Sequence, residues 1–202
     1  MPERPKVAII AGGLRGIGLA TGELLRTEGW RVVLADRDSP VGDSHEDFDC
    51  RQFDVTDTRS VDSLVASVVE TYGRIDGLVN AAGFNRHQRI DELQDETWQM
   101  LLDVHLGGAI RLCRAISIPL RKTLGAVVNF SSISSRVGRP RRAPYAAAKA
   151  GIEALTRTLA VEWAPHGVRV NAVVPGIVNT RMVQENIAKG LVQLDSLSAS
   201  FP

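Results

Sequence analysis

The sequence has few cysteines, few aromatic residues and no long hydrophobic run. Its two cysteines, Cys50 and Cys113, lie far apart and form no CxxC or Cys/His spacing, so neither a disulfide framework nor a zinc site is expected. The first apolar run, Val7–Ala11, is too short for a signal peptide or a membrane span. These absences favour a soluble protein of a reducing compartment, the cytoplasm, with no metal site and no membrane partner.

An excess of one charge is also missing. Lys and Arg number 24 against 23 Asp and Glu, for a net charge of +1. A nucleic acid partner is therefore not expected, because proteins that bind one normally carry a basic field. Hydrophobic residues make up 44% and charged residues 23% of the chain, which is typical of a globular protein, and 202 residues suit one domain, 1–202.

Short β-branched runs alternate with longer helical patterns along the chain. Strands are expected at residues 7–11, 31–35, 51–53, 75–79, 126–130 and 169–174, and helices at about 17–28, 60–72, 92–122 and 145–164. Several of these strands are apolar on both faces, as in a buried parallel sheet. The pattern predicts an α/β fold, a three-layer α/β/α Rossmann-type doubly wound parallel sheet. Gly29 and Gly73 are expected to end the first two helices, and Thr58 or Ser60 to cap the second.

A glycine-rich turn joins the first expected strand to the first helix. Gly12, Gly16 and Gly18 have the spacing GxxxGxG. Glycines at this place let a pyrophosphate approach the backbone, while the helix N-terminus offers unpaired N–H groups and a partial positive charge. The same glycines also suit a plain turn, so the motif by itself is a weak signal of dinucleotide binding.

An acidic residue, Asp36, follows the second expected strand, where a carboxylate can bind the adenosine ribose hydroxyls. It would repel a 2′-phosphate, since two like charges about 4 Å apart at an effective dielectric of ~20 cost roughly 4 kcal/mol. The cofactor is therefore expected to be NAD rather than NADP. Arg15 and Arg37 keep NADP open, because either can neutralise a phosphate. Asp36 also suits an ordinary turn.

Tyr145 and Lys149 lie four residues apart at the start of an expected helix and therefore share a face. A lysine ammonium beside a phenol favours the phenolate, so the pKa of Tyr145 is expected to fall below its reference of about 10. Such a tyrosine exchanges a proton with an alcohol or ketone. Ser132, just past the fifth expected strand, can hydrogen-bond a substrate oxygen or the tyrosine.

With these residues in order, the chain resembles the short-chain dehydrogenase/reductase family, in its simple single-domain branch. The matching motifs are Gly12-x-x-x-Gly16-Ile17-Gly18, Asp54-Val55, Asn80-Ala81-Ala82-Gly83, Ser132, Tyr145-x-x-x-Lys149 and Pro175-Gly176-Ile177-Val178-Asn179-Thr180. The resemblance implies an NAD(P)-dependent oxidoreductase that transfers a hydride between nicotinamide and a secondary alcohol or ketone. The alternatives are a 3-oxoacyl carrier-protein reductase that uses NADPH, and a dinucleotide-binding protein without turnover.

The resemblance also implies residue roles. Tyr145 is the acid/base, Lys149 holds the nicotinamide ribose, and Ser132 rather than Ser131 orients the substrate oxygen. Asp54 accepts from the adenine amino group, and Val178 and Thr180 fix the nicotinamide carboxamide. The full set expected to bind the cofactor is Gly12, Arg15, Gly16, Ile17, Gly18, Asp36, Asp54, Val55, Asn80, Ala81, Gly83, Tyr145, Lys149, Pro175, Gly176, Val178 and Thr180.

His105 departs from the family pattern, which usually has an asparagine there that holds a helix bend and a water leading protons to the lysine. Because a histidine can also relay protons, His105 is added to the catalytic residues, with retained but altered activity expected. A half-buried histidine bonded to the backbone is the alternative.

The end of the chain is the second departure. The family continues past Pro202 into a helix and a last edge strand, so a truncated chain of lower stability is expected. Segment 182–202 is expected to be a substrate lid, with Ile187, Leu191 and Leu194 on one helical face.

Two basic stretches flank the expected site. One holds Arg136, Arg139, Arg141 and Arg142, and the other covers residues 85–89. They predict an anionic substrate, such as a carboxylate, a coenzyme A ester or an acyl-carrier phosphopantetheine, with a solvated basic loop as the alternative. Small residues at 146–151 allow another helix to pack closely, from a second subunit of a homodimer or homotetramer or from the same chain.

Overall fold

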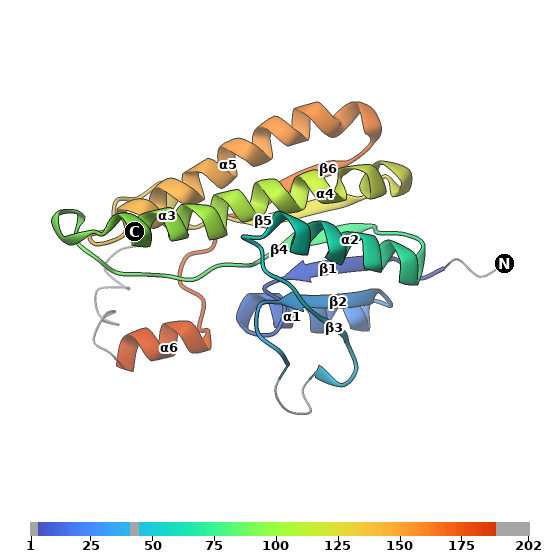
Figure 1. Ribbon diagram of the computed structural model, residues 1–202, viewed down its shortest axis with the longest axis horizontal. Coiled ribbons are helices and arrows are strands. Elements are labelled where there is room, and N and C mark those ends of the chain that lie inside the picture. The colour runs from blue at the N-terminus through green and yellow to red at the C-terminus, as the bar shows by residue number, and fades with distance from the viewer. Residues whose placement is uncertain (1–3, 41–44, 189–202) are drawn as a thin grey trace.

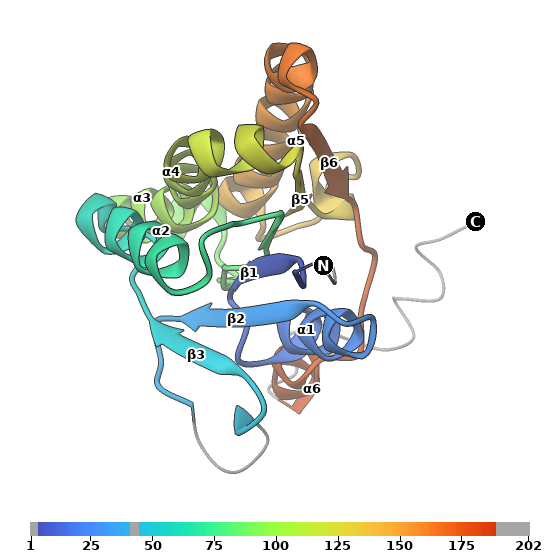
Figure 2. The same cartoon turned by 90° about the vertical axis from the view of Figure 1, so that its right-hand side faces the viewer.

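The computed structural model of the chain describes residues 4–40 and 45–188. In this part of the chain six parallel strands form one sheet, in the order β3-β2-β1-β4-β5-β6 (Figures 1 and 2). The strands are β1 (Val7–Ala11), β2 (Arg31–Asp36), β3 (Asp49–Gln52), β4 (Gly77–Asn80), β5 (Ala126–Phe130) and β6 (Arg169–Val173). The direction of the order reverses between β1 and β4, which is the point where open α/β sheets bind their ligands.

Helices cover both faces of this sheet. They are α1 (Gly16–Thr27), α2 (Thr58–Tyr72), α3 (Asp95–Leu102), α4 (Gly108–Thr123), α5 (Ala143–Trp163) and α6 (Arg181–Ala188). Figure 2 shows α2, α4 and α5 over one face and α1 over the opposite face. The predicted three-layer α/β/α fold is confirmed.

The core is divided by the sheet into two hydrophobic clusters. Alternate residues of β1 point to opposite faces, so Ile9 packs with Leu64 of α2 and Ile116 of α4, while Ile10 joins the cluster that contacts Leu19 of α1. This two-sided burial explains why β1 and β2 read as continuous apolar runs rather than as alternating ones.

The helix expected at 92–122 is interrupted. It consists of α3, a π-helical turn over Asp103–Gly107, and α4. The apolar pattern runs through the turn, so periodicity alone did not detect it, yet a π-bulge inserts an extra residue and frequently marks a functional site. Its consequence here is that His105 points into the molecule, with only 3% of its surface exposed.

The expectation that Thr58 or Ser60 caps the N-terminus of α2 is wrong. The carboxylate of Asp57 caps this helix by accepting from the backbone N–H of Arg59 at 2.9 Å. Thr58 is the first helical residue, and the Ser60 hydroxyl accepts instead from the N–H of Asp54. Gly29 and Gly73 follow α1 and α2 with φ of +82° and +74°, a conformation that glycine adopts without strain, as expected.

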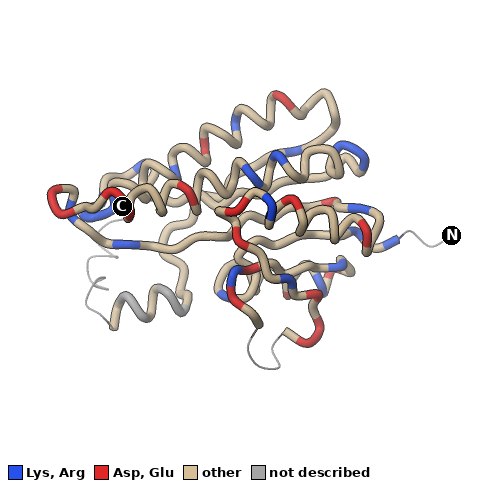
Figure 3. The backbone as a smooth tube through the Cα atoms, viewed as in Figure 1, with Lys and Arg blue, Asp and Glu red and all other residues tan. Residues whose placement is uncertain are grey.

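The strand β6 lies at one edge of the sheet, and no further strand pairs with it among the residues the structure describes. The segment expected to form a lid, 182–202, begins within α6, and its residues 189–202 lie outside the described ranges. No helix in the described ranges is both long and apolar enough to span a bilayer. Charges of both signs are interspersed along the backbone (Figure 3).

Candidate active site

The glycine turn packs against the end of β4. Gly12 and Gly16 have φ of +75° and +56°, which disfavours any side chain. A Cβ at Gly12 would lie 2.7 Å from the carbonyl carbon of Ala81, and one at Gly16 would lie 3.5 Å from Cγ2 of Thr180. Three motifs that are far apart in the sequence therefore meet at the switch point of the sheet.

Among the residues that the structure describes, no side chain caps the N-terminus of α1. Its cap residue, Arg15, makes no side-chain hydrogen bond to the helix, and the first turn carries no acidic residue. The N–H groups of this turn thus keep their capacity to bind an anion, next to Gly16, whose exposed backbone no Cβ covers. This arrangement fits the diphosphate of a dinucleotide, with Ile17 and Gly18 in the first turn of the helix.

Asp36 ends β2 beside this turn. Its carboxylate accepts from the N–H of Leu14 at 3.4 Å and lies 3.9 Å from the guanidinium of Arg15. Arg15 is also ion-paired with Asp38. Of the two cations that could neutralise a 2′-phosphate, Arg15 is therefore shared between two carboxylates, and Arg37 is largely exposed, 3.9 Å from Asp38.

The residues expected at the adenine and along the central strands lie at the same edge of the sheet. Asp54 accepts from the N–H and the hydroxyl of Thr56 at 2.8 and 2.7 Å, and these hydrogen bonds lower the pKa of the Asp54 carboxyl. Val55 is buried against Gly108 at the start of α4. Asn80 is buried at the end of β4.

Asn80 belongs to a buried amide chain that the sequence did not reveal. Its amide donates to the side-chain oxygen of Asn129 on β5 at 3.4 Å, and the amide of Asn129 donates to the hydroxyl of Thr156 on α5 at 3.1 Å. These bonds join two neighbouring strands to the helix that carries Tyr145 and Lys149.

Lys149 is buried, with 6% of its surface exposed. Its ammonium donates to the carbonyl oxygen of Phe130, the last residue of β5, at 2.6 Å. Its Nζ lies 5.7 Å from the centroid of the Tyr145 ring. Burial lowers the pKa of Lys149 to about 8, because desolvation disfavours the charged form.

The expectation that the pKa of Tyr145 falls below its usual value is wrong for the protein without bound cofactor and substrate. Burial raises that pKa, and this effect outweighs the opposing effects of a hydrogen bond with Ser132 and the nearby charge of Arg142. Spacing along the helix correctly placed the lysine near the phenol, but it gave no measure of how far both groups are removed from water. The phenol is protonated at neutral pH.

Ser131 and Ser132 face different partners. The Ser132 hydroxyl accepts from the N–H of Ser134 at 3.2 Å and lies near enough to Tyr145 to favour the phenolate, whereas the Ser131 hydroxyl donates to Glu153 at 2.8 Å. Glu153 also accepts from Ser135 and pairs with Arg136 at 3.1 Å, so it fastens the serine loop to α5. Sequence reasoning missed Glu153, although its position four residues after Lys149 places it on the same side of α5.

His105 lies beneath the site, edge-on to the Tyr145 ring with 5.3 Å between ring centroids. Its Nε2 lies 2.7 Å from the carbonyl oxygen of Phe84, while its buried Nδ1 has no hydrogen-bond partner in the described part of the chain. Burial and the charge of Lys149 lower the pKa of His105 to about 3. A Cβ at Gly83 would lie 2.6 Å from Nδ1, so the glycine makes room for the imidazole.

The loop after β6 completes this edge of the sheet. The carbonyl oxygen of Pro175 accepts from the N–H of Ile133 at 2.9 Å, which joins the loop to the serine segment. Gly176 and Val178 are exposed, and the N–H of Thr180 donates to the carbonyl oxygen of Val178 at 2.7 Å. The loop therefore runs from the serine segment after β5 to the glycine turn at Gly16.

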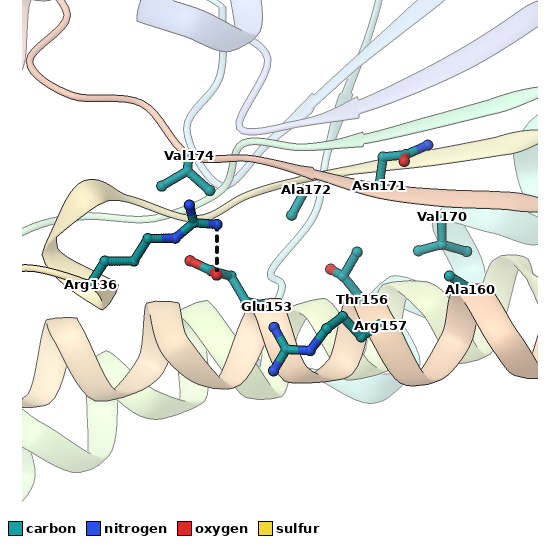
Figure 4. Close-up of a pocket in the computed structure, with 9 residues that line it drawn as sticks. All are labelled: Arg136, Glu153, Thr156, Arg157, Ala160, Val170, Asn171, Ala172 and Val174. Carbon is teal, nitrogen blue, oxygen red and sulfur yellow. Dashed lines mark hydrogen bonds and ion pairs between the residues drawn. The ribbon is translucent and has the colours of Figure 1, made fainter.

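A hollow of about 290 Å³ lies elsewhere, between α5 and the edge strand β6 (Figure 4). Arg136, Glu153 and Arg157 line it, and Tyr145 does not. Within residues 4–40 and 45–188, no cluster of His, Cys, Asp and Glu is arranged to hold a metal ion.

The family of this chain follows from its sequence match and from the geometry together. Residues 6–190 match the short chain dehydrogenase family. The chain belongs to this family. It is an NAD(P)-dependent oxidoreductase.

Several relatives show the extent of the similarity. The short-chain reductase protein NovJ of Streptomyces niveus is 41% identical over 89% of this chain and 71% of its own length. The 3-oxoacyl-[acyl-carrier-protein] reductase FabG of Thermotoga maritima is 36% identical over 89% of this chain and 77% of its own length. The crystal structure of gox2181 superposes with a TM-score of 0.92 at 35% identity, over 99% of this chain and 82% of that one.

The buried amine of Lys149 generates a prediction about stability. Its pKa is about 8 in the folded chain and near 10.5 when exposed, so between these values the unfolded state binds more protons and the free energy of unfolding rises with pH. From pH 7 to pH 9.5 this contribution becomes more favourable by about 2 kcal/mol. Urea unfolding at the two pH values should show this gain as a difference between the wild type and Lys149→Met, and an equal response of both proteins to pH would contradict it.

Proposed function

We propose that the chain interconverts a secondary alcohol and a ketone, with Tyr145 as the acid/base. The observation that supports this most directly is the assembly of Ser132, Tyr145 and Lys149 beside the switch point of the sheet, within reach of an uncapped helix and its glycine turn. These three side chains come from the segment that follows β5 and from α5, and the buried amide chain of Asn80, Asn129 and Thr156 holds β5 and α5 together.

The nicotinamide, when bound, supplies or accepts the hydride. The Tyr145 phenol is protonated near neutral pH, which is the form that donates a proton to a carbonyl oxygen as the alcohol forms. The Ser132 hydroxyl orients that oxygen, and the Lys149 ammonium, held by the Phe130 carbonyl, stabilises negative charge on the phenol oxygen. In the opposite direction the phenolate takes the proton from the alcohol.

The Tyr145→Phe change tests the acid/base role. We expect kcat/KM to fall by about 100-fold to 10,000-fold, because a positioned proton donor contributes that much, while dinucleotide affinity stays nearly unchanged. Tyr72→Phe is the matched control, since Tyr72 lies at the end of α2 and bonds Asp49 away from this site. Turnover of Tyr145→Phe at the rate of the control would contradict the proposal, and binding without turnover in the wild type would favour a binding protein.

We propose NAD as the preferred cofactor, held by Asp36 at the ribose and by the glycine turn at the diphosphate. The pairing of Arg15 with Asp38 supports this, because it leaves less positive charge for a 2′-phosphate. The similarity to the FabG reductase of Thermotoga maritima keeps a 3-oxoacyl carrier-protein reductase using NADPH as the second candidate. Asp36 argues against that candidate.

The Asp36→Asn change separates the two cofactors. Removal of the charge should raise the ratio of kcat/KM with NADP to kcat/KM with NAD by at least about 10-fold. The reason is that the Asp36 carboxylate and a 2′-phosphate repel each other by roughly 4 kcal/mol before solvent screening. Asp62→Asn, on the surface of α2, is the control and should leave the ratio unchanged. A wild-type preference for NADP would overturn the proposal before any variant is made.

We propose that His105 acts as a neutral relay or spacer under Tyr145 rather than as a charged acid. Its pKa of about 3 means that it does not titrate in the range where the enzyme is assayed. The unpartnered Nδ1 can accept a hydrogen bond from a water or from the tyrosine region.

The His105→Asn change should therefore retain activity, with kcat lowered by less than about 10-fold, below the 100-fold or more that loss of a general acid costs. The measurement is kcat and kcat/KM between pH 5 and pH 8 for both proteins. An inflection in this range that disappears in His105→Asn would show that the imidazole titrates during turnover, contrary to the proposal.

We propose further that the chain functions as one domain in the cytoplasm, as a homodimer or homotetramer, with segment 182–202 over the substrate. Exposed apolar residues on the outer helices support association, among them Ile118 of α4, 64% exposed, and Val161 of α5, 78% exposed. Light scattering measures the mass directly, and a monomer at assay concentration would contradict the proposed assembly.

We also propose that the substrate carries an anionic group, as the basic segments beside Tyr145 indicate.

A further inference from the structure

Two basic segments meet beside Tyr145. The N–H of Gln88 donates to the carbonyl oxygen of Arg141 at 3.1 Å, and the guanidinium of Arg142 lies 3.2 Å from Nε2 of His87, 55 residues away in sequence. The segment that follows β4 and the segment that precedes α5 are thus joined at the acid/base.

The cations of these segments are not equivalent. Arg136 is paired with Glu153 at 3.1 Å, and Arg89 with Asp91 at 2.9 Å. Arg142 is half-buried, and no described carboxylate lies within ion-pair distance of it. Its guanidinium carbon lies 5.8 Å from the centroid of the Tyr145 ring. Arg142 therefore carries a positive charge that no described side chain neutralises. This charge lies at the place where a substrate must bind.

His87 holds this guanidinium without neutralising it. Burial lowers the pKa of His87 below its usual value, and the charges of Arg142 and Arg141 act in the same direction. The imidazole is therefore neutral near pH 7, and its Nε2 accepts one of the five N–H donors of the guanidinium. The other donors remain for a ligand.

The position of Arg142 in the fold is electrostatically unfavourable without an anion. It is the N-cap residue of α5, a helix of 21 residues with no acidic side chain in its first turn. The N-terminus of a helix carries a partial positive charge and attracts anions rather than cations. Burial lowers the pKa of Arg142, which shows that its charge is partly desolvated as well. A bound anion would relieve both costs.

We propose that Arg142, positioned by His87, binds a carboxylate that belongs to the substrate itself, a few bonds from the carbon that reacts at Tyr145. The inference rests on the proposed oxidoreductase function and names its substrate class, an oxo acid or hydroxy acid. Arginine binds carboxylates in a bidentate manner that fixes orientation as well as affinity. A phosphate at the far end of a pantetheine arm lies too far from the reacting carbonyl, because the Arg142 guanidinium carbon lies over the tyrosine ring, only 5.8 Å from its centroid.

The test compares oxo acids with their own methyl esters. The panel places one to five bonds between the carbonyl carbon and the carboxylate, and each compound is reduced by the holoenzyme with reduced nicotinamide cofactor. The wild type should prefer the acids. Arg142→Gln should lower kcat/KM for the preferred acid by about 10-fold to 100-fold, mainly through KM, since hydrogen bonds to charged groups contribute about 1.5–3 kcal/mol. Its ester should change by less than about threefold.

Two variants control this result. Arg121→Gln removes an exposed charge from the C-terminal end of α4, outside both basic segments, and should leave acids and esters as in the wild type. Arg142→Lys keeps the charge but loses the bidentate geometry, so its preference for acids should be intermediate.

The possible outcomes distinguish a failure of the carboxylate-binding inference from a failure of the proposed oxidoreductase function. If the wild type reduces neutral ketones and esters as well as it reduces acids, or if Arg142→Gln impairs both equally, the inference is overturned and the oxidoreductase function stands. If acids, esters and neutral ketones all fail, the proposed function fails and the inference falls with it.

Discussion

The hydrogen bond from the buried ammonium of Lys149 to the carbonyl oxygen of Phe130 is the contact on which the site depends. It joins the catalytic helix α5 to the last residue of β5, at the edge of the sheet where the strands end. An amine at this depth loses much of its hydration, so it stays only where a carbonyl replaces part of the lost water. The same bond fixes the distance between the lysine and the phenol of Tyr145, one helical turn earlier.

Other polar contacts reinforce this attachment. The chain of Asn80, Asn129 and Thr156 crosses two strands to reach α5, and Glu153 fastens the serine loop to the same helix. Buried polar groups of this kind are costly unless each finds a partner, and once satisfied they favour a single arrangement. The rigid side of the site is therefore built on α5, whereas the glycine turn provides an accessible backbone for the cofactor on the other side of the switch point.

The sequence was a good guide to the fold and a partial guide to the site. Apolar runs on β1 and β2 predicted a parallel sheet because both faces of these strands are buried, and the spacing of Tyr145 and Lys149 placed them on one side of a helix. The π-turn at His105 and the Asp57 cap were missed, because neither changes the apolar period of its helix. The pKa of Tyr145 was misjudged, because the degree of burial depends on segments distant in sequence.

The sequence by itself determined the order of the elements, the glycine turn, the acid at the end of β2 and the set of residues around Tyr145. These features are local, since they follow from periodicity, turn chemistry and short spacings. Only the tertiary structure decided which charges are neutralised. It paired Arg15 with Asp38 and Arg136 with Glu153, and it set Arg142 against a neutral His87 beside Tyr145. Electrostatic energy depends on distance in space and on desolvation, and neither quantity can be read from positions along a chain.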